Sequence, residues 1–284
     1  MLQVRSMHKS DVPFAIRLCS QEKWGVTRYD LERILQLDPA GSFIASEGAR
    51  RLGLATSTSY GKTLAWIGNV IVDRNARGKE IGRILVERTI NHLKRKHIRH
   101  VALYCFKENL SFYKRLGFVG DARFLRLRRK AKRADSRLFD SRFDDARRLN
   151  QLLAMDRVAF GADRSKLIRL VIAEKLGFFI ESSEMFTIKS FLMIRKYKDM
   201  CEFGPWVSLK PRGYELTEML RRALNETEGR PVEISVLQKN VQVLTLLRDH
   251  GFRVLNEGCR MFYDEKAHVG DDRAQCALGF LDKG

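Results

Sequence analysis

The sequence predicts an α/β protein with two related domains, each built on a mixed sheet. Strand-like apolar runs alternate with amphipathic helical stretches along the chain. A length of 284 residues is comfortable for two domains. The order strand, helix, strand, helix, Gly-Phe, strand occurs twice, and the pairs Gly117-Phe118 and Gly251-Phe252 lie 134 residues apart. These observations together predict a tandem repeat of one domain type.

In the first half, helical apolar spacing predicts helices over 10–18 and 28–37, with Asp11 and Thr27 as N-caps. A longer helix is expected over 81–96, and a short one within 109–118 that ends at Gly117. Period-two or continuous apolar runs predict strands over 2–7, 42–47, 51–60, 64–73, 100–106 and 119–128.

The second half predicts strands over 202–209, 231–237 and 253–264, with helices over 212–224 and 240–252. Residues 128–137, RRKAKRADSR, are charged and poor in apolar side chains, and we expect them to form a linker. The predicted domains are therefore 1–130 and 138–284.

The charge is strongly basic and unevenly placed. The formal net charge is +19, and residues 77–148 hold 22 Lys and Arg against 8 Asp and Glu. Such an excess favours an anionic partner, either nucleic acid, a polyphosphate cofactor or an acidic protein. The basic run 123–148 is either a solvated connector or a nucleic-acid surface.

Apolar runs, cysteines and histidines narrow the class of protein further. No apolar run reaches the roughly 18 residues of a membrane span, and the N-terminus has no apolar core of a signal peptide. Five scattered cysteines without a CxxC motif predict reduced thiols and a cytoplasmic protein. The six histidines show no metal-ligand spacing, so no metal is expected.

The stretch IVDRNARGKEIGRIL, residues 71–85, carries the most chemistry. An apolar strand passes through a glycine-containing basic loop into an amphipathic helix. Free backbone N–H groups and the helix dipole at such a junction attract an anion, and Arg77, Lys79 and Arg83 add full positive charges. The loop matches neither a Walker A nor a GxGxxG pattern. Without further context it is either an anion site or an ordinary strand-to-helix turn.

The context favours a cofactor site. VIVDRNARGKEIG, residues 70–82, followed by FYKRLGF, residues 112–118, resembles the GNAT superfamily of N-acetyltransferases, which bind acetyl-CoA. That family has a loop with the pattern Arg/Gln-x-x-Gly-x-Gly/Ala. Arg77 occupies its first position, Gly82 its last, and Glu80 replaces the middle glycine. The resemblance covers about residues 1–128.

The resemblance implies roles for individual residues. The backbone of Val70, Ile71 and Val72 would pair with the pantetheine arm in the manner of an added strand. Asn109 would contact the cofactor, and Tyr113 would protonate the leaving CoA thiolate; a partly buried core tyrosine is the alternative for Tyr113. The pyrophosphate would be held by the loop residues Arg77, Gly78, Lys79, Glu80, Ile81, Gly82 and Arg83.

The general base and the acceptor are not evident. Many relatives supply a glutamate from the strand before the loop, but TLAWIGNVIV, residues 63–72, has no acid. Glu22, Asp30 and Glu32 either face the acceptor or are ordinary solvated acids. Trp24 and Tyr29 either form a wall of the acceptor pocket or pack on the core. The acceptor is an unidentified amine, on a small molecule or a protein.

The second half lacks the loop pattern, and Leu247 stands where the first half has its tyrosine. It resembles the degenerate C-terminal domain of two-domain GNAT proteins, with residues 159–164 and 204–206 as its marks, and we expect it to cover one side of the acceptor site. The sequence thus predicts an N-acetyltransferase that transfers acetyl from acetyl-CoA to a primary amine by direct attack. The alternative is a non-catalytic basic module that binds nucleic acid or senses CoA.

Overall fold

The computed structural model describes residues 1–22, 24–131, 146–175, 177–185 and 187–284. The first half forms the strands β1 (Leu2–Ser6), β2 (Phe43–Glu47), β3 (Arg50–Tyr60), β4 (Leu64–Val72), β5 (His100–Phe106) and β6 (Phe118–Arg129). Its helices are α1 (Val12–Gln21), α2 (Arg28–Leu37), α3 (Ile81–Arg95) and α4 (Leu110–Arg115), with short 3₁₀ turns at Lys9–Asp11, Arg74–Ala76 and Lys107–Asn109. The predicted elements of this half are all present.

The second half begins with a helical pair, α5 (Ala146–Phe160) and α6 (Ser165–Ala173), which the sequence analysis did not predict. The other helices are α7 (Gly213–Asn225) and α8 (Val241–Asp249). The strands are β7 (Gly177–Glu184), β8 (Thr187–Lys196), β9 (Cys201–Ser208), β10 (Val232–Leu237), β11 (Arg253–Tyr263) and β12 (Gln275–Ala277). The mixed α/β fold class is confirmed.

The two predicted N-caps have different outcomes. Thr27 caps α2 as expected: its hydroxyl accepts from the Asp30 amide at 3.3 Å, and the Asp30 carboxylate accepts from the Thr27 amide at 2.9 Å. Asp11 makes no side-chain cap for α1. Its carboxylate accepts from the His8 amide instead and pairs with Arg5 and Arg51. Asp11 therefore has the predicted N-cap position, but its side chain does not cap α1, because two arginines and the His8 amide bind its oxygens.

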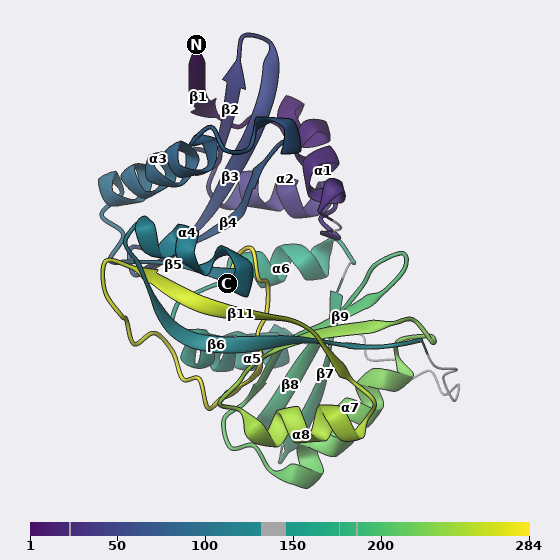
Figure 1. The fold of residues 1–284 in the computed structure, drawn as a ribbon. Coiled ribbons are helices and arrows are strands. Elements are labelled where there is room, and N and C mark those ends of the chain that lie inside the picture. Colours follow the sequence, from purple (N-terminus) through teal and green to yellow (C-terminus); the bar gives the residue numbers. More distant parts are fainter. Residues whose placement is uncertain (23, 132–145, 176, 186) are drawn as a thin grey trace.

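The strands form one twelve-stranded sheet in the order β1-β2-β3-β4-β5-β11-β6-β10-β9-β8-β7, and β12 pairs with β9. β11, from the end of the chain, lies between β5 and β6 (Figure 1). The register places Cys259 opposite Cys105 and Met261 opposite Leu103. On its other side, β6 pairs with β10, with Leu127 opposite Ile234. The last strands of the two halves are thus interleaved in the sheet.

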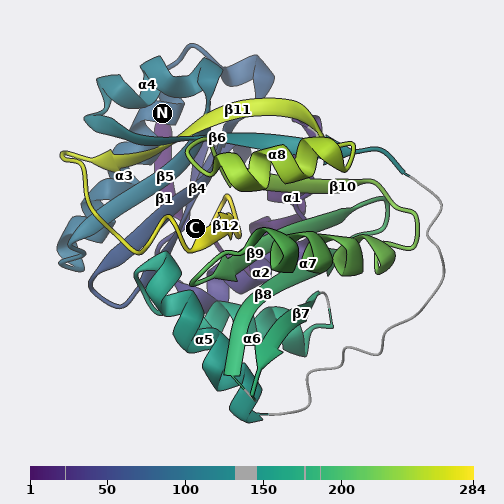
Figure 2. The same ribbon diagram turned by 90° about the horizontal axis from the view of Figure 1, so that it is seen from below.

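This interleaving makes the halves share structure. The predicted linker 128–137 begins inside β6, which extends to Arg129, and residues 132–137 lie outside the described part of the chain. One buried cluster joins Trp66 and Tyr60 of the first half to Leu152 and Phe160 of α5 and to Phe262 of β11. Figure 2 shows the C-terminal end of the chain in the middle of the molecule, between the two halves.

Candidate active site

The site forms where two parallel strands separate. β4 and β5 pair from Leu64 and His100 as far as Ile67 and Leu103. Beyond these residues β5 continues beside β11, whereas β4 stays with β3. Asn69 has a φ of 47°, which is unusual within a strand and accompanies a shift in the β3–β4 register. The edge of residues 68–72 that faces β5 therefore has no strand partner.

The loop after β4 presents a row of free amides. Within the described structure, the amides of 78–83 donate to no backbone or side-chain oxygen, and the first bond of α3 is from the Ile84 amide to Glu80 at 3.0 Å. Consecutive free N–H groups at the start of a 15-residue helix form a concave site that favours an anion. Such an arrangement suits an anionic group.

Backbone conformation explains the glycines of this loop. Gly78 has a φ of 79° and Glu80 a φ of 58°, both in the left-handed region. The glycine that the family has at position 80 is thus the residue that this conformation favours. A Cβ on Gly82 would lie 3.5 Å from the Phe112 ring, which is an ordinary van der Waals contact.

The basic side chains of the loop already have acidic partners. Arg77 donates to Glu22 at 2.7 Å and to the carbonyl of Val72 at 3.2 Å. Arg83 pairs with both Glu80 and Glu87. Lys79 is exposed. The phosphates of a bound cofactor would compete with these carboxylates, which are exposed enough to release the arginines.

Glu22 lies beside the loop, in the pair with Arg77 and with Arg74 at 3.1 Å. The hydrogen bond from Arg77 holds the pKa of Glu22 below its usual range. A carboxylate with a lowered pKa is a weak proton acceptor at neutral pH. This geometry favours a loop-anchoring role for Glu22 over that of the general base.

Tyr113 lies on α4 with its ring between Phe112 and Phe118, at centroid distances of 5.0 and 5.7 Å. The side chain is 8% exposed, and burial raises the pKa of its phenol well above the usual range. Asn109 is exposed at the N-cap of the same helix, without a side-chain cap bond.

The other acids and aromatics proposed for the acceptor are placed differently. Asp30 is not a solvated acid, because it is 4% exposed and pairs with buried Arg33 at 2.7 Å. Glu32 pairs with Arg28 along α2. Trp24 packs, partly buried, on the core of α1 and α2, whereas Tyr29 is 52% exposed.

Two polar residues at the strand separation were missed in the sequence. The Asn69 amide donates to the Asp282 carboxylate at 3.2 Å, and Asp282 in turn pairs with the buried ammonium of Lys283 at 2.6 Å. The Gly68-Asn69 pair inside an apolar strand is a known signal of a bulge and was available in the sequence. No pattern of spacing in the sequence predicts that Asn69 contacts Asp282.

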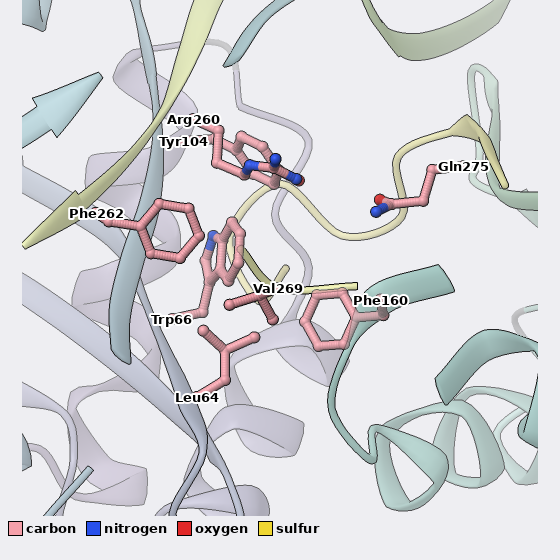
Figure 3. Close-up of a pocket in the computed structure, with 8 residues that line it drawn as sticks. All are labelled: Leu64, Trp66, Tyr104, Phe160, Arg260, Phe262, Val269 and Gln275. Atoms are coloured by element: carbon pink, nitrogen blue, oxygen red, sulfur yellow. The ribbon is translucent and has the colours of Figure 1, made fainter. Parts of the chain in front are cut away.

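A small pocket lies on the same face of the sheet, at the junction of the two halves. Figure 3 shows the rings of Trp66, Tyr104, Phe160 and Phe262 around it, with Arg260 beside Tyr104. The indole Nε1 of Trp66 has no hydrogen-bond partner among the described residues, although the side chain is 2% exposed. An unpaired buried donor of this kind favours a hydrogen-bond acceptor in the pocket.

The strand-to-helix turn of the second half that corresponds to this loop lies within the described residues and has a different composition. This turn, 209–212, contains Pro211, which has no amide hydrogen to donate. Leu247 is fully buried in an apolar cluster. Arg164, at the end of the marker 159–164, is also buried and pairs with Asp156 at 2.8 Å. In the marker 204–206, Trp206 donates to Ser190 at 3.3 Å.

The basic run 123–148 is only partly described, because residues 132–145 lie outside the described part. In β6, Arg126 and Arg128 both pair with Glu233. Among the described residues, His, Cys, Asp and Glu form no group able to hold a metal ion. In that same part of the chain, none of the helices has the length and apolar character to cross a bilayer.

Comparison with known families agrees with this geometry. The model of the Acetyltransferase (GNAT) family matches residues 8–118, and that of an Acetyltransferase (GNAT) domain matches residues 152–275. A protein named Uncharacterized N-acetyltransferase YitH, from Bacillus subtilis (strain 168), is 24% identical over 276 residues, which are 93% of this chain and 92% of that protein. Histone acetyltransferase TAP1 of Glycine max is 33% identical over 76 residues. Those are 27% of this chain and 33% of TAP1, so this chain spans only about a third of that relative.

Solved structures share the complete fold. A putative acetyltransferase from Pyrococcus horikoshii has a TM-score of 0.82 at 18% identity, covering 100% of this chain and 96% of its own. A tandem GNAT protein from the clavulanic acid biosynthesis pathway has a TM-score of 0.65 at 13% identity, covering 94% and 100%. With two GNAT domains in one chain and a relative that matches over nearly the whole of both chains, the protein belongs to the GNAT superfamily of N-acetyltransferases, as a two-domain member.

Proposed function

We propose that the protein transfers an acetyl group from acetyl-CoA to a primary amine, and that residues 70–83 hold the cofactor. The observation that carries this proposal is the row of free amides at 78–83 beside the unpaired edge of β4. Pyrophosphate would accept from those amides at the positive end of α3. The pantetheine amides would bond to the backbone of Val70–Val72 as an added strand.

In this proposal the cofactor and the amine approach β4 from opposite sides and react where they meet. A neutral amine attacks the thioester carbonyl carbon, the new C–N bond forms, and the C–S bond breaks as the thiolate leaves. Tyr113 donates a proton to that thiolate, the new amide nitrogen releases its extra proton to solvent water, and Tyr113 takes a proton back from solvent; burial raises the pKa of the phenol, so it is protonated at neutral pH before the reaction. Most of the rate enhancement comes from positioning the two reactants, because no covalent enzyme intermediate is needed.

The second half plays a supporting part in this proposal. With Pro211 in its turn and Leu247 in its core, it does not bind CoA. It instead covers the face of β4 opposite α3, where α5 and β11 surround Trp66. The acceptor amine would enter on this face, and it belongs either to a small molecule or to a protein.

Calorimetry with acetyl-CoA and a panel of amines assayed for thiol release would test the proposal. Gly82→Trp should abolish acetyl-CoA binding in a folded protein, because the indole would fill space that the pyrophosphate needs beside the amides of 78–83. Gly213→Trp is the matched control: Gly213 is also at a helix start with room for a side chain, but in the second half. Unchanged affinity in Gly82→Trp would show that the cofactor site is elsewhere.

A further inference from the structure

The segment Asp282–Gly284 lies against β4 at the point where β4 leaves β5. The backbone oxygen of Asp282 is so close to Gly68 that a Cβ at position 68 would lie 2.1 Å from it. Asn69 donates to the Asp282 carboxylate, and the Tyr60 hydroxyl donates to the carbonyl of Lys283. The segment thus covers the face of the strand opposite the cofactor loop.

The Lys283 side chain points into the protein. It is 1% exposed, its ammonium lies 2.6 Å from the Asp282 carboxylate, and it is 3.9 Å from the buried carboxylate of Asp30 on α2. Burial of a lysine ammonium is costly and requires paired charges around it. Here the charges come from two elements, the C-terminal segment and α2, that meet beside the open edge of β4.

Two buried hydrogen-bond donors near the segment 282–284 have no partner among the described residues. Gly284 packs against Trp66 and Phe160, which line the pocket of Figure 3. The Trp66 Nε1 donor in that lining is buried without a partner, and Nη1 of Arg33, beside Asp30, is also buried without one in the described structure. Unsatisfied donors around an internal occupant indicate a site that a different molecule would satisfy better.

We propose that residues 282–284 occupy the acceptor site and that the Lys283 ammonium stands where the ammonium of the acceptor binds, between Asp282 and Asp30. This inference rests on the proposed function and narrows it: the acceptor is a primary alkylammonium compound. The segment must move aside before such a compound can enter. The acceptor site is then closed by the chain's own lysine until a competing amine displaces it.

Kinetics with n-propylamine test this proposal, because this amine matches the part of the lysine side chain beyond Cβ. Lys283→Met keeps the apolar stem and removes the charge that pairs with Asp282 and Asp30, which is one of the contacts that hold the segment. If the segment fills the site nine-tenths of the time, the KM for n-propylamine should fall about tenfold, with kcat and acetyl-CoA affinity unchanged. Lys196→Met is the matched control, because Lys196 pairs with Glu228 far along the sheet. An unchanged KM in Lys283→Met would overturn the proposal.

Chemical rescue gives a readout that does not depend on turnover. In Lys283→Ala, n-propylammonium should raise Tm by more than isosteric n-propanol does, because only the cation pairs with Asp282 and Asp30; equal effects would contradict the proposal. If Lys283→Ala does not fold, the Lys283→Met kinetics decide between the outcomes.

Acetyl-CoA binding separates this inference from the proposed function. If acetyl-CoA binds but neither wild type nor variant acetylates n-propylamine, this inference fails alone. If acetyl-CoA does not bind, the proposed function fails.

Discussion

The side chain of Asn69 donates a hydrogen bond of 3.2 Å to the carboxylate of Asp282, across 213 residues of sequence. Asn69 is the strand residue with a left-handed backbone, at the position where β4 and β5 separate. The bond therefore fixes the end of the chain to the opening between these strands. Opposite it, on the helical side of β4, lie the loop 73–80 and Tyr113.

Replacing Gly68 by alanine should destabilise the protein. The new Cβ would overlap the backbone oxygen of Asp282, so the C-terminal segment must shift away from β4. Overpacking of this kind costs about 1–3 kcal/mol. Denaturant unfolding measures the loss, and Gly25→Ala is the control, because no atom lies within 4 Å of a Cβ there. Equal stability of the two variants would mean that the segment does not press on Gly68.

Tyr113→Phe should lower kcat and leave acetyl-CoA affinity intact. The ring keeps its contacts with Phe112 and Phe118, so packing survives. Loss of a general acid costs roughly 10²–10⁴-fold in rate. We expect a value near the lower end, because a thiolate with a pKa of about 8.5 leaves moderately well without help. Wild-type turnover would instead make Tyr113 an ordinary core residue.

Glu80→Gly should strengthen acetyl-CoA binding modestly. The substitution removes a negative charge from the loop, releases Arg83, and places glycine at a φ of 58°. A charge beside a helix N-terminus is worth about 0.3–1 kcal/mol. Glu87→Gln removes the other partner of Arg83 without altering the backbone, and calorimetry on both separates charge from conformation. Weaker binding in Glu80→Gly would show that Glu80 makes a contact the cofactor needs.

Acid should destabilise the protein partly through Asp11. Burial alone would raise the pKa of Asp11, but hydrogen bonds from Arg5, the His8 amide and Arg51 outweigh it and hold the pKa far below its usual range. A folded pKa below the unfolded value stabilises the protein above about pH 3.9, and that stabilisation is lost as the pH falls toward the folded pKa. Asp11→Asn should therefore cost about 1–3 kcal/mol at pH 7. Its unfolding free energy should also depend less on pH below 4, and an unchanged pH dependence would contradict this assignment.

The two halves should not fold when separated. A fragment of residues 1–131 loses β11 and β10 from the two sides of β6, and a fragment of residues 146–284 leaves β11 without either neighbour. Unpaired central strands expose backbone groups and apolar faces to water. Circular dichroism of each fragment should show loss of structure, and mixing them should restore it. Independent folding of either fragment would show that the shared strands are dispensable.

The sequence alone predicted the local elements and the loop that we propose as the cofactor site. The period of apolar residues predicted the helices and strands, and RGKEIG after an apolar strand predicted the anion site, because those signals lie within a few residues of one another. The pairing of Thr27 with Asp30 is local in the same way. The roles of Val70–Val72, Asn109 and Tyr113 remain predictions that the geometry is compatible with.

Tertiary structure decided which strands are neighbours and what lies opposite the loop. β11 between β5 and β6 follows from pairing across more than a hundred residues, which no periodicity encodes. Glu22 and Asp30 were indistinguishable as acids in the sequence, yet one joins Arg77 on the loop and the other is buried with Arg33. In the sequence, nothing distinguished Lys283 from the many other basic residues. Only the fold, by bringing α2 and the end of the chain to the same strand, placed its charge between two carboxylates.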